Sequence, residues 1–392
     1  MNGENQHIKF AKAFKVIILI VLSIPLCFQL LNKSFFTPLN GVQNSKTTQL
    51  NDSFQGQFSF IDRTLQQYLE AKIEENLIVK SPLVRLRNQY EYSFFQKLNA
   101  QQIYQYGDQL FRFYDPTYNE ASLFLGKEKI EAKIKKLTEI QAYLGKEHPI
   151  ITLIAPSKTY FYSEYLPEIH KFQTESSNYK AIKKELIKKH LSVIDFNQLF
   201  LQLKDKTQAP LFGKSGIHWT SYGATLAMDS LVTYLENRKQ DQFQHSNWKL
   251  NSTYEFLYND QDLGQLLNVL YPPNDLMLRN PIFIQPKQHK RKIKALIISD
   301  SYFDVISITK LRSQIFTSDS DYLYYFNTRK DPTNNNQSID KNELLSKMKE
   351  CDCILLMNDI VNMEDFGWGF IETAFDQIKS ETKKDIRGHK RK

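Results

Sequence analysis

Two short segments of this sequence contain residue types that can perform nucleophilic chemistry. Residues 299–303, Ser-Asp-Ser-Tyr-Phe, follow directly on the apolar run 295–298. Residues 216–223 contain His218 at the start of an expected helix. A serine just past a buried strand is held on a tight turn with its hydroxyl exposed, and a histidine is the side chain best suited to take that proton near neutral pH. Ser301 and His218 together predict acyl-transfer chemistry.

Apolar strands and amphipathic helices alternate along the chain, which predicts an α/β fold with a mostly parallel sheet covered by helices on both faces. In such sheets a site forms at the carboxyl ends of the strands, where Ser157-Lys158, Asp195, Ser301 and Asn358-Asp359 could converge. We expect strands at 150–154, 191–194, 295–298, 322–326 and 353–357, helices at 60–100, 127–144, 181–190 and 220–236, and a hairpin at 104–114.

The N-terminal region predicts a membrane anchor. Residues 16–33 are strongly apolar and approach the ~20 residues that span a bilayer. Lys9, Lys12 and Lys15 precede them, which places the N-terminus inside the cell. The segment lacks small residues suited to cleavage, so an uncleaved anchor is favoured over a signal peptide. A buried apolar helix of an intracellular protein is the weaker alternative.

These patterns divide the chain into five expected parts. They are a cytoplasmic N-terminus (1–15), a transmembrane anchor (16–33), a linker (34–56), one α/β domain (57–376) with an irregular polar insertion (240–290), and a basic tail (377–392). The tail lacks aromatics and periodicity, which favours a solvated, disordered end over a nucleic-acid or lipid site.

Composition narrows the chemistry further. With 392 residues, 41% of them hydrophobic, the chain can bury a large core, and 51 Lys+Arg against 43 Asp+Glu give a net charge of +8. Three cysteines form no disulfide framework, and no cluster has metal-ligand spacing. The 13 glycines include no dinucleotide fingerprint. We therefore expect neither a cofactor nor a metal.

Both motifs resemble those of the alginate O-acetyltransferase accessory proteins, the AlgJ/AlgX/DHHW-type family. Ser299-Asp300-Ser301-Tyr302 is similar to the family's Gly-Asp-Ser block, and His218-Trp219-Thr220 is similar to its Asp-x-His-Trp-Thr segment. The resemblance covers roughly residues 55–375. It implies an SGNH-like three-layer α/β/α fold, with Ser301 as nucleophile and His218 as general base.

One departure from the family pattern concerns the acid that orients the histidine. The family has an aspartate two residues before the histidine, where this chain has Gly216. Asp195 is our first candidate to replace it and Asp205 the second. Alternatively, Ser301 and His218 act as a dyad, or the domain has lost catalysis and retained binding.

Four further residues are candidates for substrate binding. Lys158 could bind an anionic sugar or a developing negative charge, although an ordinary exposed lysine is the simpler interpretation. Trp219 and Tyr302 could stack on sugar rings, and Asn268 could donate to an oxyanion.

The resemblance implies an extracytoplasmic, periplasmic protein of the bacterial inner membrane that acts in polysaccharide O-acetylation. Its acceptor would be a polysaccharide, and a membrane-bound O-acyltransferase would be its partner. An esterase and a non-catalytic polysaccharide-binding subunit are the alternatives.

Overall fold

A computed structural model describes residues 14–16, 19, 23, 37–41, 46–55, 57–61, 63–76, 79–113, 124–168, 177–251, 257, 260–273, 278–286, 290–330 and 336–389. The chain divides into two compact units. The smaller comprises residues 1–101 and 264–272, and the larger comprises residues 102–263 and 273–392. The domain bounds expected at 57–376 stay a prediction; within that range, residues 57–101 and 264–272 fall in the smaller unit.

The larger unit is built on a seven-stranded mixed sheet. Its five neighbouring strands from β8 to β4 run parallel, while β9 and β10 are antiparallel additions at one edge. The spatial order is β10 (Gln337–Ser338), β9 (Thr328–Arg329), β8 (Asp321–Tyr324), β7 (Ala295–Ser299), β11 (Cys353–Asp359), β3 (Ile150–Ala155) and β4 (Ser192–Asp195).

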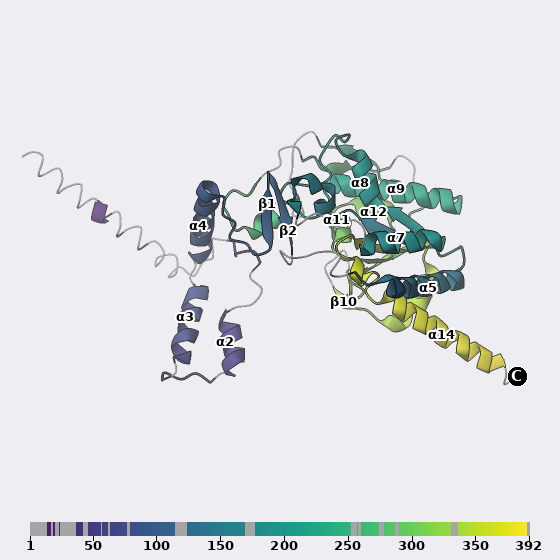
Figure 1. Cartoon of the computed structure of the whole chain (residues 1–392), viewed down its shortest axis with the longest axis horizontal. Helices are drawn as coiled ribbons and strands as arrows, with labels where there is room; N and C mark the ends of the chain where they lie inside the picture. The colour runs from purple at the N-terminus through teal and green to yellow at the C-terminus, as the bar shows by residue number, and fades with distance from the viewer. Residues whose placement is uncertain are drawn as a thin grey trace, which may run out of the picture. The chain divides into compact units, whose positions relative to one another are not determined.

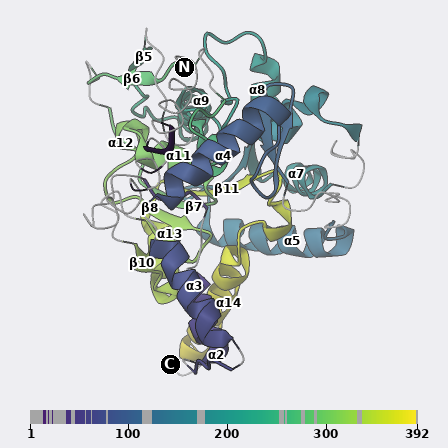
Figure 2. The ribbon, with the colours of Figure 1, turned by 90° about the vertical axis from the view of Figure 1, so that its left-hand side faces the viewer.

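Helices cover both faces of this sheet, as Figures 1 and 2 show. Alternate strand residues face opposite sides, so Ile151 and Leu153 pack in one core while Ile150 and Ile154 pack in the other. The first core includes α8 (Phe196–Leu203), α9 (Ser221–Lys239), α11 (Tyr302–Ile308) and α12 (Leu311–Ile315). The second includes α5 (Lys127–Leu144), α7 (Asn178–Lys188), α13 (Leu344–Glu350) and α14 (Phe370–His389).

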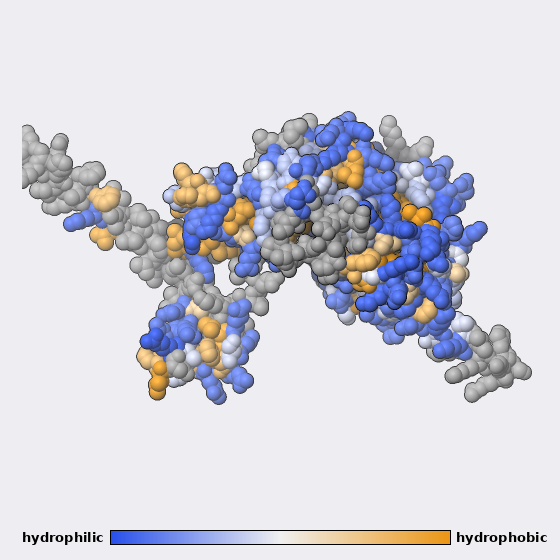
Figure 3. Space-filling view, viewed as in Figure 1, coloured by the Kyte–Doolittle hydropathy of each residue, from blue (hydrophilic) through white to orange (hydrophobic). Residues whose placement is uncertain are grey.

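Smaller elements surround this three-layer body. The surface of the larger unit that Figure 3 shows is mostly hydrophilic, with small separate apolar patches. Most of its apolar side chains lie in the two cores. The smaller elements are β1 (Ile103–Tyr106), β2 (Gln109–Arg112), α6 (Lys158–Phe161), β5 (Trp248–Leu250), α10 (Asp262–Leu266), β6 (Pro281–Phe283), and the 3-10 turns Ser163–Tyr165, Lys341–Glu343 and Met363–Asp365.

The strongly periodic predictions are confirmed. The helix expected at 127–144 is α5 with those bounds, and the five expected strands are β3, β4, β7, β8 and β11. The hairpin expected at 104–114 is the antiparallel pair β1–β2, which turns at Gly107 with φ of 61°. Residues 127–144 have the helical apolar period that buries one face of α5, whereas β3, β7 and β11 are short apolar runs buried on both faces.

Two other expectations need correction. The insertion at 240–290 is not wholly irregular, because β5 pairs with β6 and α10 lies between them in sequence. The basic tail is helical as far as His389, because α14 continues through it. Phe370, Ala374 and Ile378 recur at helical spacing and pack in the core that includes α5.

The smaller unit contains three helices among the described residues: α2 (Lys46–Phe54), α3 (Thr64–Asn76) and α4 (Lys80–Phe95). Helix α2 lies in the segment expected to be a linker. Asn88 of α4 donates from Nδ2 to the carbonyls of Leu267 (3.0 Å) and Asn268 (3.2 Å), which joins residues 264–272 to this unit.

The predicted anchor at 16–33 lies almost entirely outside the described residues, which include only Val16, Leu19 and Ser23 of it. None of the helices in the described part of the chain is both long and apolar enough to cross a bilayer. The anchor therefore stays a prediction.

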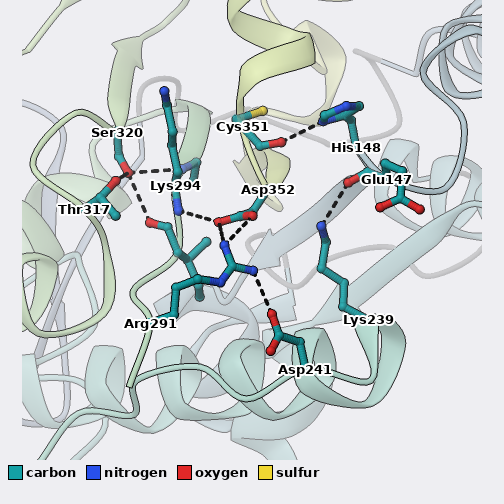
Figure 4. A network of polar contacts seen from close by, with 12 residues as sticks. Glu147, His148, Lys239, Asp241, Arg291, Lys294, Thr317, Ser320, Cys351 and Asp352 are labelled. Carbon is teal, nitrogen blue, oxygen red and sulfur yellow. Dashed lines mark hydrogen bonds and ion pairs between the residues drawn. The ribbon is translucent and has the colours of Figure 1, made fainter. Parts of the chain in front are cut away.

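A charged network closes the amino ends of the central strands, as Figure 4 shows. Asp352, just before β11, accepts two hydrogen bonds from Arg291 (2.7 and 2.8 Å) and one from the backbone N–H of Lys294 (2.9 Å). Arg291 also binds Asp241 (2.8 Å), the second residue after α9. These contacts fix the amino ends of β7 and β11. In sheets of this kind a site forms at the opposite, carboxyl ends of the strands.

Candidate active site

Ser301 lies on the turn between β7 and α11, and Asp300 holds that turn in place. The fully buried Asp300 accepts the N–H of Tyr302 on Oδ1 (3.0 Å) and the N–H of Asp359 on Oδ2 (2.8 Å). The turn is thereby fixed to the end of β11, while Ser301 itself stays partly exposed. A serine in this position can reach a substrate without reorganisation of the sheet.

His218 links Ser301 to a carboxylate. Its Nε2 lies 2.8 Å from Ser301 Oγ, and its Nδ1 lies 2.7 Å from Asp262 Oδ2. A carboxylate only accepts hydrogen bonds, so Nδ1 carries the proton and Nε2 accepts from the serine hydroxyl. The three side chains form the serine–histidine–acid geometry that recurs on unrelated folds.

Asp262 occupies the role that the family resemblance assigns to an aspartate at position 216. Its Oδ1 accepts the backbone N–H groups of Ile217 and Leu263, both at 2.8 Å, so the carboxylate is fixed while Oδ2 meets His218. It comes from the start of α10, inside the insertion expected to be irregular. Sequence reasoning missed it, since no motif marks a partner 44 residues from the histidine.

Asp195, the expected acid, is engaged elsewhere. Its carboxylate accepts from Tyr179 (2.6 Å) and Lys183 (2.5 Å), and it caps α8 through the N–H of Gln198 (3.0 Å). It ends β4 at the sheet edge, three strands from β7, a separation of about 14 Å at the usual strand spacing. The second candidate, Asp205, lies exposed on a turn. The structure thus brings Asp262, rather than Asp195 or Asp205, to His218.

Lys158 is buried rather than exposed, with 2% of its surface accessible. Its ammonium donates to the carbonyls of Gly213 (2.7 Å), Lys214 (2.8 Å) and Gly216 (2.9 Å). These carbonyls belong to the loop that leads directly into His218. Lys158 therefore shapes the histidine loop and leaves no accessible head group for the sugar-binding role expected of it.

Trp219 and Tyr302 are also buried, at 0% and 3% exposure, which leaves no ring face for a sugar. Trp219 Nε1 donates to the carbonyl of Tyr302 (3.1 Å), and the Tyr302 hydroxyl donates to the carbonyl of Ile217 (3.4 Å). The two side chains join the histidine loop to the nucleophile helix. Asn268 belongs to the smaller unit, where its amide pairs with the backbone of Asn40 (2.8 and 3.0 Å).

The site concentrates carboxylates around one imidazole. Burial lowers the pKa of His218, but the Asp262 hydrogen bond and charge, with the charges of Asp300 and Asp359, outweigh it and raise that pKa above 6.5. Burial raises the pKa of Asp300, and the neighbouring Asp359 raises it further. Burial likewise raises the pKa of Asp359. The surroundings therefore favour the imidazolium that forms when His218 takes a proton.

Metal chemistry has no evident ligand set in the part of the chain that the structure describes, because no three His, Cys, Asp or Glu side chains there are grouped to hold an ion. The arrangement around Ser301 can instead activate a hydroxyl by proton removal.

Comparison with known proteins finds a family model that matches part of the chain. Residues 112–290 match the family model described as the SGNH hydrolase-like domain of the acetyltransferase AlgX. The matched segment contains His218 and Asp262 and ends before Ser301. No curated protein matches the chain.

Solved structures give distant similarities. The O-acetyltransferase domain of Pseudomonas putida AlgJ is 15% identical, with a TM-score of 0.44 over 72% of this chain and 100% of that chain. Bacillus cereus PatB1 is 12% identical, with a TM-score of 0.43 over 67% of this chain and 96% of that chain. Pseudomonas aeruginosa AlgX is 13% identical, with a TM-score of 0.40 over 71% and 69% of the two chains. The match to the family model confirms the resemblance found in the sequence: residues 112–290 of this chain are similar to the SGNH hydrolase-like domain of the acetyltransferase AlgX.

Proposed function

We propose that this protein is a polysaccharide O-acetyltransferase that uses Ser301 as nucleophile, His218 as general base and Asp262 as the orienting acid. The observation that carries the proposal is the unbroken line of contacts from Ser301 Oγ to His218 Nε2 (2.8 Å) and from His218 Nδ1 to Asp262 (2.7 Å). Removing the serine proton leaves a positive imidazole, and a fixed carboxylate at this distance stabilises it.

The reaction would proceed in two balanced halves. Ser301 Oγ attacks the acetyl carbonyl carbon of the donor, and its proton passes to His218 Nε2. The tetrahedral intermediate collapses, the donor's leaving oxygen takes that proton, and acetyl-Ser301 remains. In the second half His218 removes the proton of a sugar hydroxyl, whose oxygen attacks the acetyl carbon. Ser301 leaves and recovers its proton from His218.

The substrate class and location come from the family rather than from the site. The matching model is described as an acetyltransferase, which supports acetyl as the transferred group. A polysaccharide acceptor, a membrane-bound O-acyltransferase as the acetyl source, and an extracytoplasmic domain held by residues 16–33 are parts of this proposal. The apolar run preceded by Lys9, Lys12 and Lys15 supports the anchor.

A carbohydrate esterase is the second candidate, because the site is open to water. The side chains of His218 and Asp262 are 18% and 15% exposed, and Ser301 is partly exposed. Water that reaches acetyl-Ser301 would take the acetyl group in place of the sugar hydroxyl. An esterase and a transferase with this site therefore differ only in the acceptor that attacks acetyl-Ser301.

The test uses the full chain in detergent with a chromogenic acetyl ester, with and without an acceptor oligosaccharide. Wild type is compared with Ser301→Ala and His218→Ala, and intact mass is followed for an acetyl adduct. We expect the adduct and acetyl release in wild type, and neither in the two variants. Release that rises with the acceptor identifies a transferase, while release independent of it identifies an esterase. A well-folded wild type with no adduct and no turnover would reject both in favour of a binding subunit.

A further inference from the structure

Helix α4 of the smaller unit has an exposed apolar face. Four side chains at helical spacing, each more than half exposed, form this face: Leu83, Leu86, Tyr90 and Phe94. The rings of Tyr90 and Phe94 lie against each other, with 5.0 Å between their centroids. Figure 3 shows apolar side chains on the surface over α4. A helix of a soluble protein buries such a stripe, so a continuous exposed one indicates a binding surface.

The polar side chains of α4, by contrast, hold the helix in the smaller unit. Asn88 donates to the carbonyls of Leu267 (3.0 Å) and Asn268 (3.2 Å), and Gln89 accepts the backbone N–H of Tyr271 on Oε1 (2.8 Å). At 3.6 residues per turn, Asn88 and Gln89 point away from the apolar face. The packing of α4 within this unit therefore leaves the apolar face uncovered by the part of the chain that the structure describes.

Arg85 ties α4 to the segment that follows the predicted membrane anchor. Its guanidinium donates to the carbonyls of Thr37 (2.8 Å) and Pro38 (2.6 Å). The anchor is expected to end at residue 33, four residues before Thr37. Four residues of chain reach at most about 14 Å, little more than the width of one helix. An anchored chain therefore keeps this part of α4 close to the membrane surface.

The residue types of α4 suit the interface between lipid and water. Aromatic rings concentrate at the level of the headgroups, and helices that lie in the interface combine an apolar face with basic residues. Residues 80–97 have one carboxylate, Glu91, against four cations: Lys80, Arg85, Arg87 and Lys97. This excess of positive charge attracts anionic headgroups.

We propose that the apolar face of α4 lies in the interface of the phospholipid bilayer that residues 16–33 span. This inference rests on the anchor that is part of the proposed function. A helix in the interface buries its apolar face about 5 to 10 Å into the boundary between headgroups and acyl chains. The anchor alone limits only the distance between the smaller unit and the membrane. The second contact determines which side of that unit faces the lipid.

The experiment places the full chain in vesicles of phosphatidylcholine and phosphatidylglycerol, with or without bromine on the acyl chains. Bromine quenches tryptophan fluorescence only at short range. Tyr90→Trp is compared with Tyr92→Trp, the same change on the other side of the helix, and wild type gives the background of its three tryptophans. We expect brominated lipid to remove most of the added emission in Tyr90→Trp and little of it in Tyr92→Trp. Equal quenching of the two would overturn the assignment of the apolar face.

A second pair of variants tests whether this face drives the contact. Leu86→Asp, added to Tyr90→Trp, should reduce the quenching, because a carboxylate in the interface is unfavourable. Ile187→Asp is the matched control, since Ile187 on α7 is 54% exposed and Leu86 is 57% exposed. Both changes are at exposed positions, so the melting temperature should stay near that of Tyr90→Trp. Quenching that Leu86→Asp leaves unchanged, or that Ile187→Asp reduces equally, would overturn the inference.

Failure of this inference and failure of the proposed function give different results. If alkaline carbonate extracts the chain from the vesicles, the anchor fails and this inference fails with it. If the chain resists extraction but Tyr90→Trp is not quenched, the anchor stands and the role of α4 is overturned. Emission that moves to shorter wavelength without quenching would also overturn it, and would identify a protein such as a second copy as the occupant. The serine mechanism is measured separately by acetyl release with Ser301→Ala, which should leave the quenching unchanged.

Discussion

Replacing Asp262 with asparagine removes the charge beside His218 and nearly preserves the shape of the side chain. At 2.7 Å and an effective dielectric constant of about 20, the attraction between this carboxylate and an imidazolium is about 6 kcal/mol. Part of it offsets desolvation of two groups that are mostly buried, which leaves about 4 to 5.5 kcal/mol. Since each 1.36 kcal/mol is a factor of ten, we expect kcat to fall about 10³- to 10⁴-fold.

The pH dependence provides a second, independent measure of the same contact. His218 acts as a base only when neutral, so activity should be lost as pH falls through its raised pKa, above 6.5. In Asp262→Asn the contributions that raise this pKa are reduced while burial still lowers it. The acidic limb of the rate profile should therefore move to lower pH although the rate is smaller. Initial rates with the chromogenic ester from pH 5 to 9 measure both effects.

Asp195→Asn is the matched control, because it makes the same change at the other candidate acid. The asparagine oxygen can still accept the N–H of Gln198 and cap α8, so any loss of stability should come from the ion pair with Lys183 (2.5 Å). Its kcat should stay near wild type, since Asp195 is bonded to Tyr179 and Lys183 at the sheet edge. An Asp262→Asn variant that keeps more than a tenth of wild-type kcat, or an Asp195→Asn variant that loses as much, would refute the assignment of Asp262.

Three further predictions test the surroundings of the site. Lys158→Met should lower both the melting temperature and kcat, because three loop carbonyls lose their hydrogen-bond donor, at a cost in stability of about 1 to 3 kcal/mol each. A variant with both values unchanged would contradict the positioning role. Gly213→Ala should lower kcat, because a Cβ there would lie 2.7 Å from the carbonyl oxygen of Asp260 and displace the histidine loop; wild-type acetyl release would show that the loop tolerates it. The pKa values of Asp300 and Asp359 are raised in the native state, so the native protein keeps protons on these carboxyls at pH values where the unfolded chain, with an Asp pKa of 3.8, has released them. The melting temperature should therefore fall as pH rises from about 4 to 7. Asp359→Asn should flatten that slope, and an unchanged slope would argue against the buried acidic pair.

Local sequence patterns predicted most of the secondary structure. The apolar period of residues 127–144 specifies α5 through one buried face, and short apolar runs specify the parallel strands, the central ones of which are buried on both faces. The pairing of Ser301 with His218 was also predictable, since each residue sits in a distinctive motif at the edge of an expected strand or helix. Where the period was weak, as in residues 240–290, the elements were missed.

The tertiary structure alone decided how the site is completed. Asp262 reaches His218 across 44 residues of sequence, from a segment with no pattern of its own. Lys158 follows a strand end like Ser301 does, yet it is buried because three loop carbonyls gather around its ammonium. Residue types and local periods determine which groups can react and which segments are helices or strands. Contacts between distant segments depend on strand order and loop packing, which no local pattern encodes.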